Sequence, residues 1–129
     1  MTKIIDFLNE AKVYYIATVE NEQPRVRPFG AATEYNGRLY LSTSNDKNVF
    51  KQFIENPKIE MSGMAKGKWI RIAGIAVVDE NLYAKQAMLD ANPFLKGKYS
   101  IDDEKFTVFY VDNMTAILYS NTEEPIELR

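Results

Sequence analysis

The chain has 129 residues, 16 Lys and Arg against 18 Asp and Glu, and neither histidine nor cysteine. These two absences exclude nucleophiles paired with histidine, zinc fingers, thiolate iron–sulfur clusters and haem bound through His or Cys. We therefore expect the reactive atoms of any redox or group-transfer chemistry to belong to a bound cofactor. A net charge of −2 gives no general attraction to nucleic acid or to an anionic membrane, so an anion site must be a local cluster.

The length and the 46% hydrophobic content predict one globular domain over residues 1–129, with about two-thirds of the unfolded surface buried. No apolar run approaches the ~20 residues that a membrane-spanning helix needs. We expect a soluble cytoplasmic protein without membrane or nucleic-acid partners, and the lack of cysteine agrees weakly with that location.

The first third of the chain changes from a helical to a strand-like pattern. Thr2 can cap a short helix whose apolar residues fall at helical spacing. Residues 13–19 are β-branched or aromatic without a polar break, which is typical of a buried strand. Turn residues at 21–24 then lead into a return strand over 25–33.

The next segment carries a clear hairpin signal and a helix start. Asn36 and Gly37 lie between two strand-like runs, and both positions of such a turn require positive φ. They predict a third strand over 39–44 beside the return strand. From Asn45 the apolar spacing is helical, and the helix ends at the Asn56-Pro57 pair.

The last half predicts two more strand pairs. Residues 58–64 and 68–78 form a hairpin that turns near Lys66 and Gly67, followed by a helix over 81–89 and an irregular connection over 92–105. The final pair comprises 106–111 and 115–119, with its turn at 112–113.

About seven strands and two or three short helices describe a mainly β, α+β chain, built as a small antiparallel barrel whose ends are closed by helices. Residues 106–111 are apolar on both faces of their strand. We expect a second copy of the chain to cover the outer face, which predicts a homodimer.

Residues 41–47 bring hydroxyl side chains to a strand end where a helix begins. A helix N-terminus offers unpaired N–H groups and a positive dipole end, which together suit phosphate. Lys47 adds a full charge, and Lys51 follows one turn later. In the alternative interpretation, Ser44 or Asn45 only caps the helix and the lysines form a solvated face.

Two arginines lie on the return strand. Alternation places Arg25, Arg27 and Phe29 on one face, which suits an edge strand better than a core. Because the Asn-Gly hairpin lays this strand beside residues 39–44, one arginine is expected to approach Lys47. Arg provides the planar bidentate geometry that phosphate favours.

Trp69 begins a strand with Arg71 and Ala73 on the same face. A single tryptophan in this position is typical of packing at a rim or in a core. The other interpretation is an aromatic edge beside a planar ring ligand.

In order and spacing, these segments resemble the pyridoxamine 5′-phosphate oxidase-like, FMN-binding split-barrel family. The resemblance rests on Gln-Pro-Arg-Val-Arg-Pro-Phe, Tyr-Leu-Ser-Thr-Ser-Asn-Asp-Lys, Glu-Asn-Pro-Lys-Ile-Glu and Trp-Ile-Arg-Ile-Ala-Gly. It covers the first helix to about Val78, and more loosely extends to Tyr119. It implies an antiparallel split β-barrel homodimer with FMN at the subunit interface.

The resemblance also implies roles for particular residues. Arg27 would contact the flavin phosphate and ribityl chain, Lys47 the phosphate, and Trp69 the flavin of the second subunit. The implied cofactor-binding residues are Arg27, Pro28, Phe29, Gly30, Ser42, Thr43, Ser44, Lys47, Asn48, Lys51 and Trp69.

The chain also departs from the family pattern. True pyridoxamine-phosphate oxidases carry a lysine near the end of the second strand and a C-terminal Arg-x-His segment. Here the first position falls at or near Ala32, and no histidine occurs. We therefore expect neither a vitamin B6 oxidase nor a haem protein with histidine ligation. Nitroreductase-like and general-stress-protein relatives are the nearer comparison.

The resulting hypothesis is an FMN-dependent oxidoreductase, resembling flavin, nitro- or quinone reductases, that acts on a small molecule. Residues 92–105, with Phe94, Lys96, Lys98 and Tyr99, are the candidate substrate-side lid, or else a solvated loop. The alternatives are a flavin carrier or sensor without turnover, and a reductase that binds the deazaflavin F420.

Overall fold

A computed structural model describes all residues, 1–129. The helices are α1 (Thr2–Ala11), α2 (Asn48–Glu55), α3 (Leu82–Ala91) and a short 3₁₀ helix, η1 (Pro93–Gly97). The strands are β1 (Tyr14–Glu20), β2 (Gln23–Phe29), β3 (Ala32–Tyr35), β4 (Arg38–Ser44), β5 (Lys58–Ala65), β6 (Lys68–Asp79), β7 (Phe106–Ser120) and β8 (Ile126–Leu128). None of the helices combines the length and the apolar content that crossing a bilayer requires.

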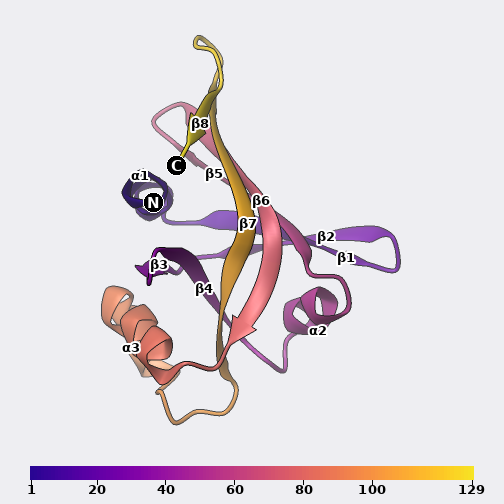
Figure 1. The fold of residues 1–129 in the computed structure, drawn as a ribbon, viewed down its shortest axis with the longest axis vertical. Coiled ribbons are helices and arrows are strands. Elements are labelled where there is room, and N and C mark those ends of the chain that lie inside the picture. The colour runs from indigo at the N-terminus through magenta and orange to yellow at the C-terminus, as the bar shows by residue number, and fades with distance from the viewer.

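All eight strands pair antiparallel in one strongly curved sheet (Figure 1). Seven of them follow the order β2-β1-β5-β6-β7-β4-β3, and β8 pairs with the C-terminal half of β7. The helices lie at the margins of this sheet. This architecture confirms the predicted mainly β, split-barrel α+β fold. The turns at Asn36-Gly37 and Lys66-Gly67 are also confirmed, because all four residues have φ between 52° and 75°.

The predicted return strand over 25–33 is wrong, because the chain breaks it into β2 and β3. β2 pairs only with β1, whereas β3 pairs only with β4, at the opposite edge of the sheet. The buried Tyr14 hydroxyl donates a hydrogen bond of 2.5 Å to the Ala31 carbonyl between the two strands. The break therefore lets one stretch of chain cross from one sheet edge to the other and close the barrel.

The predicted final hairpin is also wrong, because residues 106–120 form one long strand. Asn113 has the positive φ that the turn prediction required, 50°, but this conformation serves a β-bulge. The register with β6 shifts between Ala73 and Ile75, where β7 carries one extra residue. A bulge shifts the alternation of the strand by one residue, so Phe109 and Val111 before it and Ala116 after it all face the same barrel core.

Residues 106–111 of β7 contact two separate hydrophobic clusters, one on each face of the strand. One cluster of 17 buried residues fills the barrel. A second cluster of eight buried residues lies between the N-terminal half of β7 and the helices α3 and η1, and it includes Met88, Leu89 and Leu95. The chain itself thus covers the second apolar face of residues 106–111. The sequence argument that a second copy must cover this face is wrong.

Two helix starts differ from their predictions. α1 begins at Thr2 itself after Met1, with no side-chain cap, and α2 begins at Asn48 after Lys47 rather than at Asn45. α2 does end before Pro57, as predicted.

Gly74 lies opposite the bulge, where β6 and β7 approach closely. A Cβ atom at Gly74 would lie 2.5 Å from Cγ1 of Val111 and 2.7 Å from the carbonyl oxygen of Asp112. Because that oxygen belongs to the paired backbone, we expect Gly74→Ala to lower the free energy of unfolding by about 1–3 kcal/mol in urea denaturation. Gly97→Ala is the control, since an added Cβ there meets nothing within 4 Å. Equal losses for both variants would contradict this interpretation.

Candidate anion-binding site

A cavity of about 210 Å³ opens where β2 and β4 end and α2 begins, and η1 forms its remaining wall. No Asp or Glu lines it. Seven of the residues predicted from the sequence line this cavity: Arg27, Pro28, Phe29, Gly30, Ser42, Thr43 and Lys47. A second depression, which Asn48 helps to line, shares Arg27 and Lys47 with the first.

Arg27 reaches the cavity by a route different from the one predicted. Its strand pairs with β1 rather than with β4. The guanidinium Nη1 donates to the Ile16 carbonyl at 3.1 Å and to the Thr18 hydroxyl at 2.9 Å, while Nη2 donates to Oε1 of Gln52 at 2.5 Å. Thr18 in turn donates to the same Gln52 oxygen at 2.6 Å. Arg27 is therefore held in one place by buried neutral partners.

Arg27 keeps its positive charge in this partly buried position. Partial burial, and secondarily the nearby charge of Arg25, lower the pKa of the guanidinium below its usual value. An arginine side chain nevertheless remains protonated at neutral pH. No carboxylate is paired with Arg27, because Arg25 takes the adjacent Glu20 at 3.2 Å. The cavity thus keeps a positive charge that an anion can use.

The start of α2 presents further donors. Lys47 is the N-cap residue, no side chain caps the helix, and Lys47 makes no ion pair. Uncapped N–H groups at a helix start favour an anion. The alternative interpretation, in which Ser44 or Asn45 caps this helix, is wrong, because Lys47 is the N-cap residue and Ser44 donates its hydroxyl to Asp46 at 2.6 Å.

Asp46 is the acidic residue beside this helix start. The hydrogen bond from Ser44 lowers the pKa of this carboxyl, as does the charge of Lys105, whose Nζ lies 3.5 Å from Oδ2. The carboxylate is therefore already compensated, and Lys47 has no acidic partner in competition with a ligand.

Four predicted residues lie outside the cavity. Ser44 is turned to Asp46, and Asn48 lines only the neighbouring depression. Lys51 lies in another depression among the glutamates of the β1–β2 turn and the α2 end. Trp69 lies on the outer face of β6, where it stacks on Tyr119 with ring centroids 5.7 Å apart.

Sequence reasoning missed Thr18 and Gln52, the two residues that hold Arg27. Gln52 is buried on the same face of α2 as Val49 and Phe53. A polar residue at an apolar position of an amphipathic helix was the available signal, because a buried polar side chain needs a partner.

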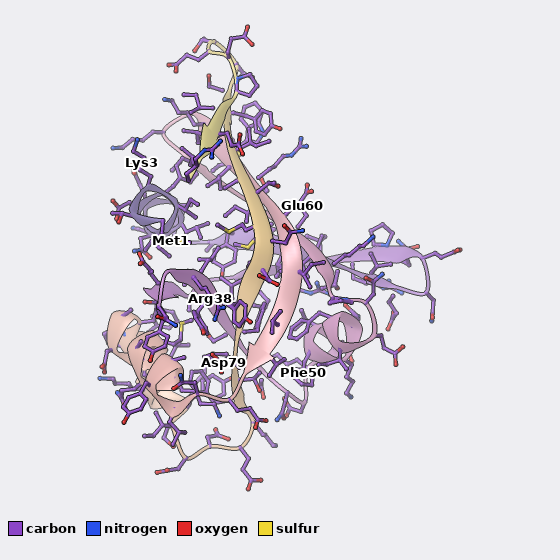
Figure 2. All side chains as sticks on the ribbon, viewed as in Figure 1. Met1, Lys3, Arg38, Phe50, Glu60 and Asp79 are labelled. Atoms are coloured by element: carbon purple, nitrogen blue, oxygen red, sulfur yellow. The ribbon has the colours of Figure 1, made fainter.

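No carboxylate side chain lines the cavity. The two tyrosines with raised pKa values lie elsewhere. Burial raises the pKa of Tyr14, while burial and a 2.6 Å hydrogen bond to Asp79, near the end of β6 (Figure 2), raise that of Tyr40 to about 12. The arrangement can therefore bind and orient an anionic ligand, and any electron transfer would depend on that ligand.

Gln52 provides a test of the Arg27 network. We expect Gln52→Leu to weaken phosphate-dependent ligand binding by about 0.5–1.5 kcal/mol, because Arg27 loses a fixed partner. The measurement is the affinity for FMN by fluorescence quenching. Gln86→Leu is the matched control, since Gln86 is exposed and bonds only Asp90. If Gln52→Leu bound FMN as tightly as the control, the network would have no positioning role.

The fold and the cavity together define a split-barrel protein with a candidate anion site. The family described as "Pyridoxamine 5'-phosphate oxidase" matches residues 1–116, and the chain belongs to this family.

Solved structures agree with this assignment. A NimC/NimA family protein from Clostridium acetobutylicum is 46% identical, with a TM-score of 0.93 over 99% of this chain and 93% of that one. General Stress Protein 26 from Bacillus anthracis is 19% identical, with a TM-score of 0.77 over 98% and 97%. A heme binding protein from Mycobacterium smegmatis is 18% identical, with a TM-score of 0.75 over 94% and 57%. No curated protein matches the chain.

Proposed function

We propose that the chain is an FMN-binding flavoprotein and that the cavity between β2, β4 and α2 holds the cofactor. The observation that carries this proposal is the cavity itself, with Arg27 and Lys47 unpaired by acids, an uncapped helix start and no carboxylate in the lining. Phosphate is the group that such a set of donors binds best.

The assignment of residues follows from their chemistry. Arg27 and Lys47 would bind the phosphate, together with the hydroxyl groups of Ser42 and Thr43. Pro28, Phe29 and Gly30 would lie along the ring. A bound flavin supplies hydride and single-electron transfer. The chain's own residues would anchor it, orient it and exclude water.

A homodimer is part of the proposal. A cofactor-sized ligand is usually enclosed by about 300–1,000 Å³, so a cavity of about 210 Å³ encloses only part of one. The outer faces of β1, β2 and β5 also leave Tyr15, Val26 and Met64 52%, 68% and 68% exposed. A second copy on this side would cover them and bring in Trp69, which lies opposite Met64. Light scattering at low micromolar concentration tests this, and the mass of a single chain would contradict it.

The proposed activity is reduction of a small molecule, in the manner of flavin, nitro- or quinone reductases. The electron donor is a reduced nicotinamide or another flavin, and the cytoplasm is the proposed location. This activity needs no general base from the chain, which agrees with a lining without Asp or Glu.

A carrier or sensor without turnover is the second candidate, because a cavity lined by anion-binding groups without Asp or Glu can hold a flavin whether or not it turns over. Reduction of the bound flavin by NADH or NADPH would support the enzyme, and failure of both would support the carrier. F420 is less well supported, because the basic residues that could extend the groove are already paired. Lys66, Lys68 and Arg71 lie 2.9, 3.9 and 3.7 Å from Glu10, Glu123 and Glu60.

The deciding experiment is the visible spectrum of the purified protein, followed by identification of the molecule released on denaturation. Flavin absorbance with released FMN would support the proposal. A haem or deazaflavin spectrum would contradict it. So would a colourless protein that fails to bind added FMN.

A further inference from the structure

The wall of the cavity formed by η1 differs in character from the wall that carries Arg27 and Lys47. Leu95 is 8% exposed and anchors η1 in the second core cluster. Tyr99 stacks on Phe106 with ring centroids 5.0 Å apart and planes 25° apart. These two anchors fix the segment against the barrel, although its neighbouring residues are turned outward.

Next to these anchors in the sequence, Phe94 and Lys98 both line the cavity. Phe94 is 63% exposed, which is a large exposure for a phenylalanine on an anchored segment. Lys98 makes no ion pair, whereas the other lysines of this region do. Lys96 lies 3.5 Å from Asp90, and Lys105 lies 3.5 Å from Asp46. Lys98 is thus the lysine of this segment left free for a ligand.

An aromatic face and a free ammonium in a cavity without carboxylates recognise one kind of molecule. The ring offers stacking to a flat ligand, and the ammonium selects a negative charge. Arg27 and Lys47 are assigned to the cofactor phosphate, so this charge belongs to a different molecule. The inference rests on the proposed function only in assigning Arg27 and Lys47 to the cofactor phosphate.

We propose that Phe94 and Lys98 form a subsite for a second ligand, and that this ligand is a flat organic anion such as an aromatic carboxylate. Because Phe94 and Lys98 are exposed, the subsite lies at the solvent-facing rim of the cavity, beside the proposed cofactor rather than enclosed with it. It makes the η1 segment, which the sequence marked as a candidate lid, the part of the chain that selects the substrate.

Two probes of nearly the same shape test the charge. para-Nitrobenzoate is an anion, and para-nitrobenzyl alcohol is neutral. Dissociation constants are measured by calorimetry for the protein as purified and after saturation with FMN. We expect the anion to bind about fivefold more tightly than the alcohol, and added salt to reduce this preference.

Variants test which residues produce the preference for the anionic probe. Lys98→Gln is expected to abolish it without changing FMN affinity, while Lys96→Gln, the matched control, keeps it. Phe94→Ala should weaken both probes alike. Circular dichroism confirms that each variant is folded.

The outcomes separate this inference from the proposed function. Equal affinities for the two probes, or a preference that persists in Lys98→Gln, would overturn the subsite. Loss of the preference in Lys47→Gln but not in Lys98→Gln would overturn it too, because the anion would then occupy the phosphate end. If no FMN binds and the preference still depends on Lys98, the subsite stands and the flavin proposal fails.

Discussion

Replacement of Lys47 by alanine should weaken FMN binding by about 1.5–3 kcal/mol and leave riboflavin binding nearly unchanged. Lys47 has no acidic partner and lies at the uncapped start of α2. Its ammonium can therefore act only on the phosphate, which riboflavin lacks. The measurement is the dissociation constant of each ligand by quenching of flavin fluorescence.

Lys51→Ala is the control for this prediction. Lys51 lies in α2, four residues after Lys47, but in a different depression that Glu20, Glu22 and Glu55 also line. Its removal should change neither affinity appreciably. Equal losses of FMN and riboflavin affinity in Lys47→Ala would refute the phosphate assignment.

Arg27→Ala should also weaken FMN more than riboflavin, but with a cost in stability. The change removes the donor to the Thr18 hydroxyl, which is 1% exposed, and one of the two donors to Oε1 of Gln52, which is 7% exposed. Buried polar groups that lose a partner destabilise the fold. Lys47→Ala is therefore the cleaner probe of the site.

The second large effect is expected in the core. Phe109→Ala should lower the free energy of unfolding by about 3–5 kcal/mol, because Phe109 is fully buried and alanine leaves a cavity. Its ring centroid lies 4.6 Å from that of Phe53 on α2 and 6.4 Å from that of Phe29 on β2. The loss would be measured by urea denaturation.

The same contacts connect Phe109 to the candidate site, because Phe29 lines the cavity and the start of α2 forms part of the cavity wall. We therefore expect weaker FMN binding in Phe109→Ala under conditions where the variant is still folded. Phe94→Ala, at a 63% exposed position, is the stability control and should change unfolding by less than about 0.5 kcal/mol. A loss below about 1 kcal/mol for Phe109→Ala would show that the site relaxes around the missing ring.

Much of the candidate site could be predicted because its residues are close in the sequence. Ser42, Thr43 and Lys47 lie within six positions, at the end of a strand and the start of a helix. That local pattern is enough to place hydroxyls, N–H groups and a charge together. Pro28 to Gly30 were placed by the resemblance, and they do line the same cavity.

The predictions that failed depended on distant pairing. Arg27 was expected beside β4, but the break after Phe29 sends β2 and β3 to opposite sheet edges. Asn113 has positive φ in a turn and in a bulge alike, so local preference could not separate the two. The partner of residues 106–111 also lay within the chain, in α3 and η1, rather than in a second copy.

By itself, the sequence determined what chemistry the chain can supply. It supplies neither histidine nor cysteine, and its hydroxyls and lysine at one helix start mark a candidate anion site, because side-chain chemistry and short-range backbone preferences are local. The tertiary structure alone decided which distant residues complete that site. Curvature of the sheet brings Arg27 to Lys47, burial ties it to Thr18 and Gln52, and packing of η1 on β7 adds Phe94 and Lys98. These contacts arise from closing a barrel around a core, and that closure depends on the whole chain at once.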